Sequence, residues 1–88
     1  MKTRKGYTLR SLGKEFILVA EGLEAVDFSR MISMNESAAF LWKAVDGKDF
    51  EIETLVNLLV EEYGITQEMA EKDVVSLLHI WKEANVIE

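Results

Sequence analysis

The sequence predicts an α+β domain in which a three-stranded antiparallel β-sheet is followed by three helices. Two observations support this fold class. Before Asn35, apolar and polar residues alternate as in strands, whereas after Asn35 the apolar residues recur every three or four positions, as on one face of a helix. The chain has 88 residues, 49% of them hydrophobic and 30% charged, which suits one folded domain over residues 1–88.

Three segments before Asn35 have the pattern of strands. The segment YTLRSL at 7–12 alternates, GKE at 13–15 offers a turn, and FILVA at 16–20 is an apolar run of strand-forming residues, so the two runs predict a hairpin. Residues 21–25 interrupt the pattern, and DFSRMISM at 27–34 resumes it as a third strand. One side of this strand has Phe28, Arg30, Ile32 and Met34, and the other has Ser29, Met31 and Ser33.

Three amphipathic helices are expected after the strands. The first begins behind Asn35, a favourable N-cap, and ends at Gly47. The second covers the apolar repeat at 52–63 and ends at Gly64, and the third begins at Thr66. The last residues are expected to form a short extended tail.

The residue types that most catalytic or metal sites need are missing. The chain has no cysteine and a single histidine, His79, so neither a catalytic triad nor a zinc site can be assembled. No glycine-rich phosphate-binding motif occurs. Trp42 and Trp81 lie on apolar helix stripes, so we expect both in the core, with His79 at the surface. We therefore expect no enzyme, no metal and no cofactor.

Charge is unevenly distributed along the chain. Residues 1–14 have five bases and no acid, a net charge of +5, whereas residues 15–88 have 16 acids and five bases, a net charge of −11. The negative charge of residues 15–88 repels the phosphate groups of nucleic acids. We therefore expect a basic peptide rather than a nucleic acid as partner. An acidic peptide would have to use the basic N-terminal segment.

The location of the protein follows from what the sequence lacks. No apolar stretch is long enough for a signal peptide or a membrane span, so no membrane partner is expected. The absence of cysteine suits a reducing interior. We expect a cytoplasmic protein.

The predicted sheet offers a place for a peptide to bind. A sheet that is not closed into a barrel leaves unpaired main-chain N–H and C=O groups along its edges. The outer side of the third strand is small or flexible, which suits an edge that a peptide approaches as an additional strand. On the third helix Val75 and Leu78 widen the apolar arc, which would either line a groove or pack against the other helices.

Several residues in a fixed order resemble the PqqD-like family. They are Met34-Asn35-Glu36, Trp42, Asp46-Gly47, the helix at 55–63, Asp73-Val74 and the closing Val86-Ile87. The resemblance covers about residues 28–88 and implies a small winged helix-turn-helix-like domain. It implies a non-catalytic chaperone, a recognition element for ribosomally made, post-translationally modified peptides. Such a domain holds the leader segment of a precursor peptide by strand addition and presents the core to a modifying enzyme, often a radical-SAM protein.

Carried over by position, the resemblance implies binding residues on two elements. On the strand they are Arg30, Met31, Ile32, Ser33 and Met34, and on the third helix they are Val75, Leu78, His79 and Lys82. Asp73 is expected to cap or orient rather than to contact the peptide.

The sequence departs from the members that serve pyrroloquinoline quinone synthesis. Those members often have a cysteine before Asp-Gly and a proline on the second strand, whereas here Val45 precedes Asp46-Gly47 and the chain has no proline. The product therefore stays open between pyrroloquinoline quinone and another peptide natural product.

Two further interpretations of the same topology stay open. A winged-helix DNA-binding transcriptional regulator would insert its third helix into the major groove, which requires basic or amide side chains on the exposed face. The acids of this helix, Glu68, Glu71, Asp73 and Glu83, outnumber its bases, Lys72 and Lys82. Alternatively, two copies would form a homodimer by pairing their free edges or stacking their helices.

Overall fold

The secondary structure elements follow in the predicted order. The computed structural model describes residues 1–21 and 26–88, with the backbone alone for residues 21 and 26–30. The strands are β1 (Tyr7–Leu12), β2 (Glu15–Glu21) and β3 (Val26–Met34), and the helices are α1 (Glu36–Val45), α2 (Ile52–Tyr63) and α3 (Gln67–Glu83). The α+β fold class is confirmed. The predicted interruption at 21–25 lies, apart from Glu21, outside the described residues.

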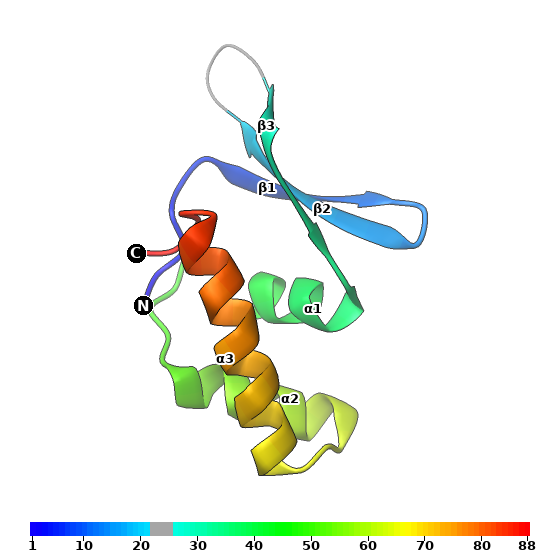
Figure 1. Ribbon diagram of the computed structural model, residues 1–88, viewed down its shortest axis with the longest axis vertical. Coiled ribbons are helices and arrows are strands. Elements are labelled where there is room, and N and C mark those ends of the chain that lie inside the picture. Colours follow the sequence, from blue (N-terminus) through cyan, green and yellow to red (C-terminus); the bar gives the residue numbers. More distant parts are fainter. Residues whose placement is uncertain (22–25) are drawn as a thin grey trace.

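Figure 1 shows how these elements are arranged. The sheet lies at one end of the molecule, α1 lies beneath it, and α2 lies at the other end, while α3 runs alongside both helices. The N- and C-termini lie side by side. The helices therefore form a layer that supports the sheet from one side.

The sheet has the order β1-β2-β3, and both neighbouring pairs are antiparallel. β2 is central, so β1 and β3 are the edges. Leu18 of β2 pairs with Ile32, but Ala20 pairs with Asp27, so one residue of β2 faces four of β3. Extra residues on one strand bend it, and Figure 1 shows the bend in β3.

Local hydrogen bonds fix the ends of the helices at the predicted places. Asn35 caps α1, because its Oδ1 accepts a hydrogen bond from the N–H of Ala38 at 2.8 Å. Thr66 caps α3 in the same way, with the N–H of Met69 at 3.2 Å. Gly64 ends α2 in the left-handed conformation with φ 64°, which glycine adopts without steric cost.

Two tryptophans form the centre of the core. Trp42 of α1 and Trp81 of α3 are 1% and 0% exposed, and their rings meet edge to face at 5.2 Å between centroids. Neither indole N–H has a hydrogen-bond partner within the described part of the chain, so packing holds the pair. Leu18 and Met34 bring the sheet into the same cluster. The prediction that both tryptophans are core residues is confirmed.

The N-terminal segment ties together two distant parts of the chain. The hydroxyl of Thr3 donates to Oδ1 of Asp46 at 3.1 Å and accepts from the N–H of Gly47 at 2.9 Å. Thr3 also forms a β-bridge with Ile87, in the expected extended tail. At 5% exposure, Thr3 has little water to replace these bonds. The basic start of the chain is therefore held at the C-terminal end of α1.

Thr3→Val should lower the free energy of unfolding by about 1–3 kcal/mol, because the side chain keeps its shape but leaves the N–H of Gly47 and the Asp46 carboxylate without their partner. Urea denaturation followed by tryptophan fluorescence measures the loss. Amide hydrogen exchange at Gly47 should become faster in Thr3→Val but not in Thr3→Ser, which keeps the hydroxyl. Unchanged exchange at Gly47 in Thr3→Val would refute this role of the hydroxyl.

Candidate functional site

β3 has one side of its backbone paired and the other side open. The strand order places it at the edge of the sheet, with β2 as its neighbour. Its side chains alternate as predicted: Ile32 is half-buried and Met34 is 5% exposed, whereas Met31 is 42% exposed and Ser33 is exposed. The prediction that the third strand is an edge strand is confirmed. The side chain of Arg30 lies outside the described part of the chain.

A hollow of about 280 Å³ opens where β3 runs into α1. The N-cap residue Asn35 and helices α1, α2 and α3 line it; the helix residues are Ser37, Ala38, Leu41, Leu59, Asp73, Ser76, Leu77 and Ile80. A second hollow of about 360 Å³ shares Asn35, Ser37, Leu59 and Asp73 with the first and adds Glu36, Tyr63 and Ile65. The two therefore form one continuous depression, which we call the α1–α3 groove. A chain that follows β3 toward its C-terminal end reaches this groove directly.

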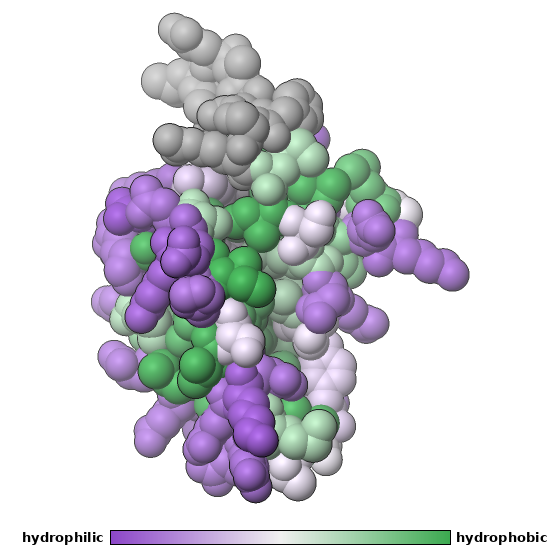
Figure 2. All heavy atoms as spheres, viewed as in Figure 1, coloured by the Kyte–Doolittle hydropathy of each residue, from purple (hydrophilic) through white to green (hydrophobic). Residues whose placement is uncertain are grey.

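One flank of α3 faces the groove. Its residues there, Asp73, Ser76, Leu77 and Ile80, are spaced by three, one and three positions, which places them along one side of a helix. Ile80 is 51% exposed although it is a large apolar residue. Figure 2 shows hydrophobic side chains gathered in the band between the upper half of α3 and β3. This flank and the β3 edge thus border the same apolar surface.

The helix residues carried over by position do not lie on this flank. Val75 lines a different hollow, of about 460 Å³, which it shares with Ile52 and Val56 of α2. Because successive residues turn by about 100°, His79 and Lys82 lie on the same side as Val75, roughly opposite Asp73 and Ile80. His79 is exposed and its Nε2 is 3.8 Å from Oε1 of Glu83 on its own helix. Val75, His79 and Lys82 therefore lie on the flank of α3 opposite the groove, and their contact with a peptide stays a prediction.

Leu78 lies on neither flank of α3. It is 3% exposed and belongs to the core cluster with Trp81 and Val74, so it has no surface to offer a peptide. Met34 is likewise covered by the core and supports the edge from beneath.

The groove residues that the sequence interpretation missed had a weak signal. Leu77 and Ile80 extend the apolar arc of α3 on one flank, and Val75 extends it on the other. Nothing in the helical period says which flank turns toward β3. That choice depends on how α3 packs against α1 and α2, for example on the contact between Trp42 and Trp81, which lie 39 positions apart.

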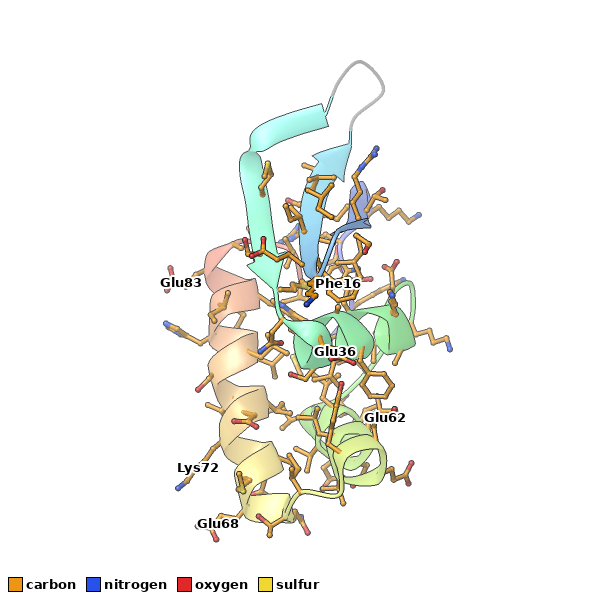
Figure 3. The ribbon with its side chains drawn as sticks, turned by 90° about the vertical axis from the view of Figure 1, so that its right-hand side faces the viewer. Phe16, Glu36, Glu62, Glu68, Lys72 and Glu83 are labelled. Carbon is orange, nitrogen blue, oxygen red and sulfur yellow. The ribbon has the colours of Figure 1, made fainter. Side chains whose placement is uncertain are left out.

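The charged residues around the groove are acidic. Glu36 and Asp73 line it, and neither has a cationic partner within 4.0 Å in the described structure. The pKa of Tyr63 is raised, first by desolvation on burial and then by the nearby carboxylates Glu36 and Glu62. Figure 3 shows Lys72 and Glu83 pointing away from α1, on the far side of α3. The groove thus has a negative potential over an apolar floor.

The described residues contain no group of three or more His, Cys, Asp or Glu side chains that could hold a metal ion. Within the same residues, none of the helices combines the length and apolar character needed to cross a bilayer.

Comparison with known proteins assigns the family. The family described as "Coenzyme PQQ synthesis protein D (PqqD)" matches residues 7–87. The chain belongs to the PqqD family. This agrees with the resemblance carried by residues such as Trp42 and Asp73, and it supports a peptide-recognition module. No curated protein matches the sequence.

A solved structure has the same fold as this PqqD-family chain. It is described as "TbiB1 in Complex with the TbiA(beta) Leader Peptide", and it matches with a TM-score of 0.74 and 15% sequence identity. The match covers 100% of this chain and 95% of TbiB1. Neither comparison supports the DNA-binding alternative.

Replacing Leu78 with alanine should cost about 2–5 kcal/mol of unfolding free energy, because it leaves a cavity beside Trp81. Ile80→Ala should cost less than about 1 kcal/mol, because half of that side chain already faces solvent. Urea denaturation of both variants gives the two values. Equal losses would mean that Leu78 is not the buried member of the pair.

Proposed function

We propose that this domain binds the leader segment of a ribosomally made precursor peptide as a fourth strand along the free edge of β3. The observation that carries the proposal is the continuity of that edge with the α1–α3 groove. The strand offers unpaired main-chain groups, and the groove offers apolar side chains directly beyond its C-terminal end. A peptide that pairs with β3 therefore gains main-chain hydrogen bonds and side-chain contacts at once.

The irregular register of β3 limits how much of the edge a peptide can use. The bend separates the pairs around Ile32 from those around Asp27, so the straight part next to the groove is short. Main-chain hydrogen bonds contribute only about 0.5–1.5 kcal/mol each. Much of the affinity must then come from peptide side chains that bind in the groove, where they contact residues such as Leu77 and Ile80. On this proposal the groove selects the peptide and the edge aligns it.

The same bend argues against edge-to-edge pairing of two copies through β3. Bulges that twist an edge are a common protection against such pairing. A homodimer would leave β3 unavailable to a leader, so sedimentation at several protein concentrations separates the two cases.

The comparisons support the proposal at two levels. The chain is a PqqD-family member, and TbiB1, which shares its fold, was solved with a leader peptide. We extend this to a non-catalytic role in which the domain presents a precursor peptide to a modifying enzyme such as a radical-SAM protein in the cytoplasm. Val45 before Asp46-Gly47 and the lack of proline leave the product open, either pyrroloquinoline quinone or another peptide natural product.

Proline substitution tests strand addition. Because alternate residues of a strand donate to opposite sides, one of Ile32 and Ser33 directs its N–H to the free edge. Proline at that position should weaken leader binding about two- to tenfold while the domain stays folded, because proline cannot donate a hydrogen bond. Proline at the other position should instead destabilise the β2–β3 pairing. Calorimetric titration with synthetic peptides tiled over the short reading frames beside the gene gives the affinities, and circular dichroism checks the fold. Two folded variants that both bind as tightly as the unchanged protein would exclude this edge.

Ile80→Ser and Val75→Ser form a matched pair for the groove. Both replace an exposed aliphatic residue of α3, at 51% and 60% exposure, but on opposite flanks. Ile80→Ser should weaken binding of the same peptides by about three- to tenfold, from the loss of apolar contact area, and Val75→Ser by less than about twofold. The reverse order would place the leader on the other flank of α3.

A further inference from the structure

The floor of the α1–α3 groove is apolar. Leu41 and Leu59 are 1% and 3% exposed and present only a small part of their surface at its base. Leu77 and Ile65 are half-buried at its sides. A floor of this kind takes up an aliphatic or aromatic side chain and offers nothing to hold a charged group.

The rim of the groove has carboxylates and no described cation. Glu36 and Asp73 stand on opposite sides, one in the first turn of α1 and the other on α3. The lysines nearest in sequence point elsewhere: Lys72 projects away from α1 (Figure 3), and the Nζ of Lys43 lies 5.1 Å from the ring centroid of Phe16. Two acids therefore face the groove without neutralisation from the protein.

The N-terminus of α1 is a source of positive potential at the same place, but it is the weaker one. A helix dipole amounts to roughly half a positive charge at this end. Part of it is already used, because Asn35 accepts hydrogen bonds from Ala38 and Ala39. Two full carboxylates outweigh it, and the raised pKa of Tyr63 agrees with a negative potential, since Glu36 contributes to it after burial.

The bases among residues 1–4 lie too far from the groove to reverse this balance. Residues 1–4 are bound at the loop after α1, through Thr3 with Asp46 and Gly47. The groove lies at the other end of α1, which is about 15 Å away at 1.5 Å per residue. That distance exceeds the screening length of about 8 Å at physiological ionic strength.

We infer that the leader recognised by this domain seats an apolar side chain on Leu41, Leu59 and Leu77 and places a lysine or arginine within a few residues of it, against Glu36 and Asp73. This inference rests on the proposed function and assigns its ligand class: an apolar segment with an adjoining base. Tyr63 lines the same part of the groove as Glu36 and Asp73. A leader with acids at these positions would be repelled by the rim.

A randomised peptide library displayed on phage and selected against the full 88-residue chain tests the inference. Peptides that lose binding to the folded β3 proline variant report on the edge site. Among these, we expect an excess of lysine or arginine close to an apolar residue. Glu36→Gln with Asp73→Asn should weaken such a peptide by about three- to tenfold and reduce the salt dependence of its affinity.

The chain contains a matched control. The double variant Glu53→Gln with Glu71→Gln also removes two negative charges. One comes from the first turn of α2 and the other from α3, and both lie at the hollow on the opposite flank of α3. This variant should bind the selected peptides with an affinity within about twofold of that of the unchanged protein. The lower net charge has only a small effect, because salt screens charges that lie far from the peptide.

The outcomes separate the two proposals. Peptides that need the β3 edge but show no excess of bases, or that respond equally to both double variants, would overturn the inference and leave the proposed function intact. A selection in which no enriched peptide depends on the β3 edge would contradict the proposed function, and the inference with it.

Discussion

The edge-to-face contact between Trp42 and Trp81 sets the spacing of the helices on which the site depends. α1 is joined to β3 through Asn35, and α3 carries the groove flank, so the distance between the two helices decides whether a hollow exists beside the end of the strand. The rings are buried, and packing rather than hydrogen bonding of the indole N–H groups holds them together. A rigid contact in the core thereby shapes a recognition surface at the periphery.

Edge and groove have different physical roles. Main-chain groups along β3 attract an extended segment irrespective of its sequence, whereas the groove discriminates by shape and charge. A domain that serves as a recognition module needs both, because backbone pairing alone would accept any strand and a small groove alone would bind weakly. The short straight part of β3 shifts the balance toward the groove.

Surface charge adds a second level of selection. The chain has a net charge of −6, and Thr3 holds the first two bases, Lys2 and Arg4, at the end of α1 that is away from the groove. The acids Glu36 and Asp73 consequently act locally, without compensation. The net negative charge of the chain and the local carboxylates Glu36 and Asp73 thus both favour a peptide with basic residues.

Much of the fold could be read from the sequence, because its signals are local. Alternation before Asn35, the helical period after it, and caps at Asn35, Gly64 and Thr66 depend on residues a few positions apart. The burial of both tryptophans followed from the same stripes. The interruption of the third strand's register was not predicted, since a bulge depends on the pairing of two strands.

The site was only half predictable for the same reason. Alternation in the third strand identified the side of β3 that faces out, and strand order then made it an edge. On α3, however, Val75 and Ile80 are both apolar and both flank the core stripe, and only the packing of α3 against α1 and α2 turns Ile80 toward the groove. Periodicity determines which residues share a face; the direction of that face is decided by contacts between residues far apart in the chain, which the tertiary structure alone provides.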